Sequence, residues 1–278
     1  MSLFITSLNS GSNGNCYYVG NEKEAVLIDA GISCRETEKR MKRLGLSMSA
    51  VRAIFVSHEH IDRISGIPGI SKKYQLPVYI SKDTLLSASI PIEKHLVHLF
   101  KAHQPIPIGE LSVSPFLKSH DAIDPHSFVV SGNDLTIGIF TDIGFSCPQT
   151  IHHFSKCHAV FLEANYCDDM LNKGSYPYYL KKRISSNSGH LSNAQALELF
   201  VKHKGKQLSH LILSHLSKNN NSPELVSKLF DEQAGATKII VASRYRETPL
   251  FCIEKGKSAV KRSGTNGSPV PVLQLSLF

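Results

Sequence analysis

The sequence predicts an α/β fold with both parallel and antiparallel strands. Short apolar runs rich in β-branched and aromatic residues alternate with segments of helical periodicity. In the middle of the chain three apolar runs follow one another with little between them, which favours antiparallel pairing there. The 278 residues, 41% of them hydrophobic, can fill the core of one large domain. One α/β domain is therefore the simplest organisation.

The expected elements follow this alternation along the chain. Strands are expected at residues 25–29, 53–57, 77–81, 135–142, 159–164, 211–215 and 238–243, with antiparallel partners at 111–120 and 127–132. Helices are expected between them, at residues 35–44, 64–74, 192–204 and 223–233. Ser192 and Ser222 take N-cap positions, and Pro223 takes the first helical position, where its missing N–H costs nothing.

The composition divides the chain into a domain and a tail. We expect residues 1–254 to form the domain and residues 255–278, rich in Gly, Ser, Pro and Lys, to be a flexible tail. The N-terminus lacks a basic start with a long apolar run, and no stretch has about 18 consecutive apolar residues, so we expect a cytoplasmic protein without a membrane span. Six scattered cysteines fit free thiols in a reducing compartment. Lys and Arg exceed Asp and Glu by 31 to 23, a net charge of +8 that favours an anionic partner.

Polar residues stand where the apolar strands stop. Because the carboxyl ends of strands form the ligand-binding edge of α/β sheets, we expect these side chains to gather there. They are Asp29, His58, His60, His120, Asp142, Glu163 and His215. The densest group lies in SHEHIDRISG, residues 57–66. Its His-x-His-x-Asp spacing can direct three side chains at one point, and imidazole and carboxylate are ligands for zinc, iron or manganese.

These motifs resemble the signature of the metallo-β-lactamase superfamily of metal-dependent hydrolases. That signature is HxHxDH after a strand, followed by a distant His, a distant Asp and a final His. The matching segments, in order, are HEHIDR at 58–63, SH at 119–120, TD at 141–142 and SH at 214–215. The resemblance covers residues 1–245 and implies an αββα four-layer sandwich with mixed sheets.

Three further segments resemble the YycJ/WalJ branch of this superfamily. They are SGSNGNCYYV at 10–19, LEAN at 162–165 and SGHLSN at 188–193. The branch implies a nuclease connected with DNA metabolism and repair. The SGSNGN turn could offer N–H groups to a phosphate or could be only a hairpin turn. Tyr166 stands where the branch tends to have His, so no role is assigned to it.

The resemblance also implies roles for the site residues. A first ion, zinc or manganese, would be held by His58, His60 and His120. Asp62 and His215 would hold a second ion, with Asp142 bridging the two. Asp29 would orient the loop. His190 and Glu163 would form the pair that protonates the leaving group; the alternative for His190 is a hydrogen bond beside a helix cap.

Arg63 departs from the signature, which has a histidine at this position. A guanidinium stays protonated and has no lone pair, so it cannot bind a metal ion. The second site could bind metal weakly, could stay empty with Arg63 paired to the carboxylates, or could be refilled by another residue. We favour the empty site, because a fixed charge ~4 Å away repels a second cation by ~4 kcal/mol at an effective dielectric near 20. Arg63 could also grip a substrate phosphate.

The last five residues, QLSLF, are the second informative motif. They resemble the bacterial sliding-clamp binding motif, which implies that Gln274 bonds at the rim of a groove filled by Leu275, Leu277 and Phe278. The alternative is a tail that packs on its own domain. With the site, this motif favours a metal-dependent nuclease or phosphodiesterase acting on DNA at the clamp. A hydrolase of small esters or phosphodiesters and a metal-poor, inactive DNA- or clamp-binding adaptor are the alternatives.

Overall fold

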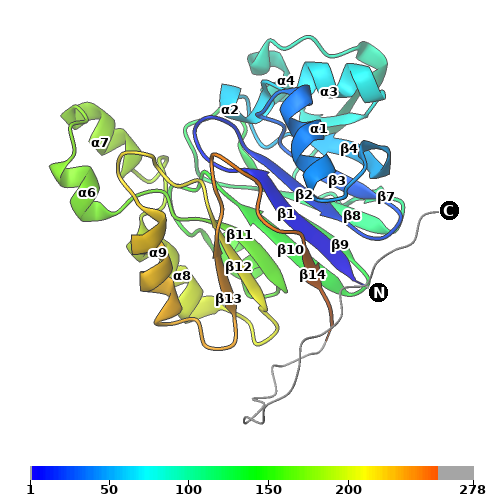
Figure 1. Ribbon diagram of the computed structural model, residues 1–278. Coiled ribbons are helices and arrows are strands. Elements are labelled where there is room, and N and C mark those ends of the chain that lie inside the picture. Colours follow the sequence, from blue (N-terminus) through cyan, green and yellow to red (C-terminus); the bar gives the residue numbers. More distant parts are fainter. Residues whose placement is uncertain (1, 256–278) are drawn as a thin grey trace, which may run out of the picture.

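Two seven-stranded sheets pack face to face, and helices cover their outer faces, in the computed structural model of the chain (Figure 1). The structure describes residues 2–255. The αββα sandwich with mixed sheets expected from the sequence is confirmed. The tail beyond Lys255, with Gln274, Leu275, Leu277 and Phe278, lies outside the described residues. No helix in the described part combines the length and apolar character needed to cross a membrane.

The first sheet has the strand order β14-β1-β2-β3-β4-β5-β6. Its strands are β1 (Leu3–Asn9), β2 (Cys16–Gly20), β3 (Ala25–Ile28), β4 (Val51–Phe55), β5 (Val78–Ser81), β6 (Val97–Phe100) and β14 (Phe251–Ile253). From β14 to β3 neighbouring strands pair antiparallel, and from β3 to β6 they pair parallel. The carboxyl ends of β3 and β4 therefore lie at one edge.

The second sheet has the order β13-β12-β11-β10-β9-β8-β7. Its strands are β7 (Ile106–Ile108), β8 (Leu111–Leu117), β9 (His126–Gly132), β10 (Leu135–Phe140), β11 (Ala159–Glu163), β12 (His210–Ser214) and β13 (Lys238–Val241). Pairing is antiparallel from β7 to β10 and parallel from β10 to β13. The antiparallel middle of the chain agrees with the prediction.

Helices form the two outer layers. The first sheet is covered by α1 (Cys34–Arg43), α2 (Ile61–Ile64), α3 (Ile67–Tyr74) and α4 (Lys82–Ala88), with 3-10 turns at Met48–Ala50 and Lys94–Leu96. The second sheet is covered by α5 (Pro148–Phe154), α8 (Asn193–His203) and α9 (Pro223–Asp231). The remaining helices, α6 (Asp168–Lys173) and α7 (Tyr178–Ile184), project from the body (Figure 1).

The helix caps agree with the sequence, and one expected helix is interrupted near its start. Ser192 forms a capping box with Gln195, and Ser222 accepts a hydrogen bond from the N–H of Leu225. The helix expected at 64–74 is instead two helices, α2 and α3, that meet at Gly66. The N–H of Gly66 leaves the helical pattern and donates to the carbonyl of Ala30 at 2.8 Å. Helical periodicity alone could not predict this contact, because it joins residues far apart in the sequence.

The core lies between the sheets and is rich in aromatic residues. Phe55 of β4 lies 5.8 Å, ring to ring, from Phe128 of β9, and Tyr17 of β2 lies 5.0 Å from Phe161 of β11. These contacts join the two sheets, and all four rings are buried. The core therefore holds the ends of β3, β4, β10, β11 and β12 in fixed relation to one another.

Candidate metal centre

The predicted ligands gather at one edge of the sandwich, where strands of both sheets end. Asp29, Asp142 and His215 each directly follow the end of a strand or lie one residue beyond it, and all three have left-handed backbone conformations, with φ of 59°, 54° and 57°. Such φ values are uncommon for residues other than glycine. The backbone thus turns sharply at each strand end, and the side chains of all three are buried.

Three imidazoles converge on one point. The ligating nitrogens of His58, His60 and His120 all lie within 4.8 Å of one another, and Nε2 of His58 is 3.1 Å from Nδ1 of His60. These histidines come from the loops after β4 and β8. The side chains that the sequence predicted as the first site are therefore together.

Hydrogen bonds fix the tautomers of two of these histidines. The N–H and Oγ of Ser57 both donate to the Asp29 carboxylate at 2.8 Å, so Ser57 Oγ is left to accept from Nδ1 of His58 at 2.9 Å. Nδ1 of His120 donates to the carbonyl of Gly189 at 3.0 Å. Nε2 then carries the lone pair on both rings: on His58 it faces Nδ1 of His60, and on His120 it is buried without a hydrogen-bond partner among the described residues.

Both of these buried rings are held neutral. Burial, aided by the Lys118 ammonium, holds the pKa of His58 well below its usual range, and burial lowers the pKa of His120 to about 4. Unshared lone pairs that face one another in a buried site repel unless a cation lies between them. The donor set fits a divalent ion that accepts imidazole ligands, and Asp142 Oδ2, 3.8 Å from His58 Nε2, lies close enough to serve as a further ligand.

Arg63 is fully buried and its guanidinium lies among three carboxylates. Its Nη2 is paired with Asp142, its Nη1 lies 3.2 Å from Asp29, and its Nε lies 3.7 Å from Asp62. Nη1 also donates to Thr141 Oγ1 at 3.1 Å. Burial opposes this charge, but the three carboxylates outweigh it and raise the pKa of Arg63 above its usual value. Burial also opposes ionisation of Asp142, yet Arg63 holds its pKa well below the usual range.

A second group of ligating side chains adjoins the first. It consists of Asp142, Glu163, His190 and His215, whose ligating atoms lie within 4.8 Å of one another. Glu163 Oε1 lies 2.7 Å from His190 Nδ1 and 3.1 Å from His215 Nδ1, and its Oε2 accepts the backbone N–H of Ile143 at 2.8 Å. Burial opposes ionisation of Glu163, but His190 outweighs it and lowers the pKa of Glu163 to about 2.

Asp62 and His215 lie close to each other and to the carboxylates around Arg63. His215 Nε2 is 3.6 Å from Asp62 Oδ2, and its Nδ1 is 2.8 Å from Asp142 Oδ1. Burial disfavours charge on this ring, but Asp142, Asp62 and Glu163 together raise the pKa of His215 well above its usual range. The side chains predicted for the second ion are thus together, with the Arg63 guanidinium and a protonated imidazole between their carboxylates.

The comparisons with known proteins agree with this geometry. The model of the family described as "Metallo-beta-lactamase superfamily" matches residues 10–154, just over half of the chain. The chain belongs to the metallo-beta-lactamase superfamily. It is a metal-dependent hydrolase of that superfamily, and its clusters of His and Asp side chains are the expected metal-binding residues.

Two curated relatives in this superfamily are similar over most of their length. The chain is 33% identical over 242 residues to "Exodeoxyribonuclease YycJ" of Bacillus anthracis, covering 84% of this chain and 91% of the relative. It is 30% identical over 223 residues to "Exodeoxyribonuclease WalJ" of Streptococcus pneumoniae, covering 78% and 83%. Among solved structures, the metallo-beta-lactamase fold protein YhfI from Bacillus subtilis has a TM-score of 0.71 at 14% identity, covering 91% of this chain and all of YhfI. That likeness shows the fold alone.

Several residues that position this superfamily site were not predicted from the sequence. Asn15 Nδ2 donates to Asp62 Oδ2 at 2.9 Å and to the carbonyl of Gly11, and Ser10 Oγ accepts the N–H of His215 at 2.7 Å. The SGSNGN turn therefore closes the β1–β2 hairpin and braces two site residues. Lys118 is buried and donates to the carbonyl of Thr141 at 2.8 Å, and burial lowers its pKa to about 8. Each acts through a contact distant in sequence.

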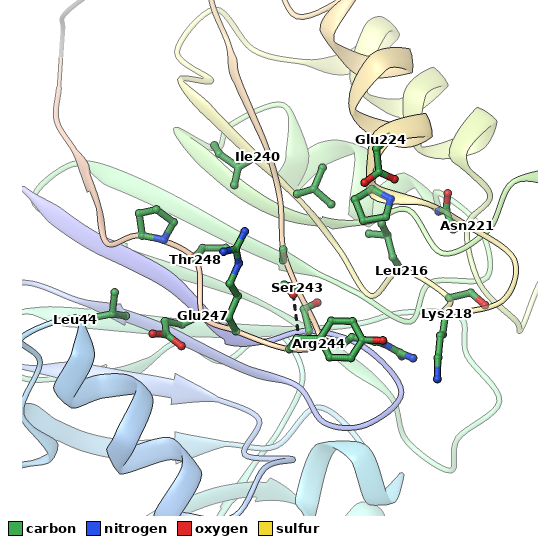
Figure 2. A pocket seen from close by; sticks show the side chains of 18 residues that line it. Leu44, Leu216, Lys218, Asn221, Glu224, Ile240, Ser243, Arg244, Glu247 and Thr248 are labelled. Atoms are coloured by element: carbon green, nitrogen blue, oxygen red, sulfur yellow. Dashed lines mark hydrogen bonds between the residues drawn. The ribbon is translucent and has the colours of Figure 1, made fainter.

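A large cavity lies beside the metal centre rather than at it. Its volume is about 790 Å³, and it lies between the segment 240–249 and the loop that leads into α9. Figure 2 shows Lys218 and Arg244 among the side chains around it. None of the described His, Asp or Glu side chains of the metal centre lines it, and its link to the centre is Ser10, which binds His215. The hydrolytic chemistry of this superfamily member is therefore assigned to the strand ends.

Proposed function

We propose that this chain is a nuclease that hydrolyses phosphodiesters of DNA with one tightly held cation, zinc or manganese. In this proposal the Arg63 guanidinium takes the place of the second cation. The observation that carries the proposal is the position of Arg63: it is buried against Asp29, Asp62 and Asp142, beside three histidines whose ligating nitrogens converge.

Electrostatics favours a single ion. Arg63 already supplies positive charge to the carboxylates that a second ion would use, and at ~4 Å two unit charges repel by ~4 kcal/mol at an effective dielectric near 20. His215 adds further positive charge on the same side. Because both groups are buried, water screens this repulsion little. A second divalent ion would therefore have to displace the guanidinium.

We assign the chemistry to the two adjacent groups. An ion held by His58, His60 and His120 supplies the Lewis acidity that makes water a usable nucleophile near neutral pH. The Glu163 carboxylate accepts the Nδ1–H of His190, which orients this ring so that its other nitrogen can donate a proton to the leaving oxygen. Arg63 balances the charge of Asp142 and Asp62 at the same time.

DNA is the proposed substrate because the two relatives are named exodeoxyribonucleases and because the net charge of +8 attracts a polyanion. We further propose that Gln274, Leu275, Leu277 and Phe278 bind the bacterial sliding clamp, which requires a cytoplasmic location. Deleting residues 274–278 should abolish clamp binding in a pull-down while leaving hydrolysis of short DNA unchanged. Clamp binding that survives the deletion would show that residues 274–278 are not the clamp-binding motif.

The direct test of the proposed function is DNA cleavage by the full chain. End-labelled linear DNA and closed plasmid are incubated with the protein and either manganese or zinc. We expect stepwise loss of nucleotides from linear DNA, no loss after His58→Ala, and no loss in chelator. Activity on a small phosphodiester or ester without any DNA cleavage would favour the small-molecule hydrolase. DNA binding with no hydrolysis of any substrate would favour the inactive adaptor.

A further inference from the structure

The segment 166–189 leaves the body between two residues of the catalytic pair. Glu163 ends β11 just before it, and His190 follows it directly. An isolated β-bridge between Tyr166 and Ser192 closes its neck. Figure 1 shows its two helices, α6 and α7, standing apart from the sandwich beside α8 and α9. We call residues 166–189 the arm; because both of its ends lie at the metal centre, the arm projects from the rim of the site.

The outer face of α7 is aromatic and basic. Tyr178 and Tyr179 are 76% and 73% exposed, and no residue of α7 is fully buried. The aliphatic residues of the helix, Leu180 and Ile184, are only partly exposed. The last turn carries Lys181, Lys182 and Arg183. Aromatic side chains as exposed as these are unusual on a helix surface. The neighbouring cations favour an anionic partner.

Contacts with the metal-ligand loop fix the position of the arm. Arg183 pairs with Asp121, which directly follows His120. Ser119 Oγ donates to the carbonyl of Asn187 at 2.7 Å, and His120 Nδ1 donates to the carbonyl of Gly189 at 3.0 Å. The C-terminal end of α7 and the residues after it are therefore tied directly to the loop that carries His120.

Three exposed side chains on α7, Tyr178, Tyr179 and Lys182, are offered to a ligand. Tyr178 and Lys182 are four residues apart and share one face, with Lys182 Nζ 5.9 Å from the centre of the Tyr178 ring. Arg183 and Lys181 are engaged, by Asp121 and by the carbonyl of Asn172. A ring on which a base can stack, next to a cation that can meet a phosphate, is the arrangement that binds single-stranded nucleic acid without sequence preference.

We propose that the outer face of α7 binds the single-stranded part of the DNA substrate and guides it to the metal centre. Tyr178 and Tyr179 stack on successive bases, and Lys182 contacts the backbone. This inference rests on the proposed function, since it names how the same substrate is held. A protein partner would call for an apolar patch, and the aliphatic residues of α7 are only partly exposed. A membrane would call for a broad apolar face on the helix.

The test measures binding and catalysis in the full chain. The probe is a fluorescent single-stranded phosphorothioate oligonucleotide, which resists cleavage. Tyr178→Ala/Tyr179→Ala should weaken its binding about tenfold or more, because stacking on each ring is lost. The same variant should raise KM for single-stranded DNA while leaving kcat and the hydrolysis of bis(p-nitrophenyl) phosphate unchanged. Lys182→Gln should lessen the salt dependence of binding by about one phosphate contact.

Two control variants separate stacking from unrelated effects. Tyr178→Phe/Tyr179→Phe keeps both rings and should bind the oligonucleotide as the parent does. Tyr245→Ala removes a tyrosine of similar exposure, 71%, from the cavity wall and should leave binding unchanged. Equal affinity of the double alanine variant and the parent overturns the inference, as does an equal loss in Tyr245→Ala.

The outcomes also separate this inference from the proposed function. If the parent cleaves DNA and the double alanine variant binds the oligonucleotide normally, the inference about the arm is wrong and the proposed nuclease function remains supported. If the parent cleaves no DNA but the variant loses oligonucleotide binding, the proposed function is wrong and the binding surface stands.

Discussion

At the scale of single residues, Arg63 decides how the charges of the site are balanced. Asp29, Asp62 and Asp142 lie around its guanidinium, and all four side chains are largely withdrawn from water. Charges in such a place are tolerated only when they are paired. Arg63 is therefore a structural counter-charge first, whatever further part it has in the reaction.

Replacing Arg63 with methionine should destabilise the metal-free protein strongly. Methionine fills much of the same volume but leaves the buried carboxylates without their partner, which costs about 3–5 kcal/mol for a buried pair. The measurement is the free energy of unfolding in urea. As control, Arg43→Met breaks a partly exposed pair with Glu247 and should cost clearly less. Equal costs for the two variants would show that the buried ion pairs around Arg63 contribute little.

His190→Ala tests the proposed proton donor. The rate of DNA cleavage should fall by about 10²–10⁴, because the leaving oxygen of DNA needs a proton. The loss should be much smaller for bis(p-nitrophenyl) phosphate, whose leaving group departs without one. Metal content should not change, and the exposed His152→Ala should behave as the parent. An equal loss on both substrates would assign His190 to binding or folding instead.

At the scale of elements, the joint between α2 and α3 holds the metal-ligand loop on the sheet. Gly66 donates to the carbonyl of Ala30, and a Cβ at Gly66 would lie 1.9 Å from the carbonyl oxygen of Ile32. A Cβ at Gly31 would meet the carbonyl oxygen of Asp62 at 1.7 Å. Two glycines therefore allow the backbones on either side of the loop to touch.

Gly66→Ala should destabilise the chain by well over ~1 kcal/mol, because backbone atoms would have to move apart. Gly69→Ala is the matched control three residues later. Its Cβ would lie 3.4 Å from Cys34 Cβ, an ordinary contact, and alanine in the helix α3 should stabilise by about 0.5–1 kcal/mol. Thermal or urea unfolding of both variants measures the difference. A stable Gly66→Ala protein would mean that the close approach is not required.

Continuous apolar runs and capped helices could be predicted from the sequence, and several other elements could not. The strands with continuous apolar runs, such as β10 and β12, and the capped helices α8 and α9 were found close to their observed bounds. Five strands, β1, β2, β6, β7 and β14, and four helices, α4, α5, α6 and α7, were not. The helices have six or seven residues each, too few for periodicity to be visible. Tertiary contacts, rather than local sequence preference, determine the secondary structure of such segments.

At the scale of the whole molecule, the site exists only because two sheets bring distant loops to one edge. The residue types and their order predicted which histidines and carboxylates would meet, since strand ends in α/β sheets share an edge. The pairing of Glu163 with His215 and the brace from Asn15 to Asp62 were not predictable, because each joins separate loops through a single hydrogen bond. In our proposal, the charges at this edge limit the site to one metal ion.

The most direct test of the account is the metal content of the purified chain, measured by plasma mass spectrometry after dialysis with zinc or manganese. We predict about one tightly held ion per chain in the parent and about two in Arg63→His, where an imidazole replaces the guanidinium and restores a second ligand set. Two tightly held ions in the parent, with no gain in Arg63→His, would contradict the claim that Arg63 takes the place of the second cation.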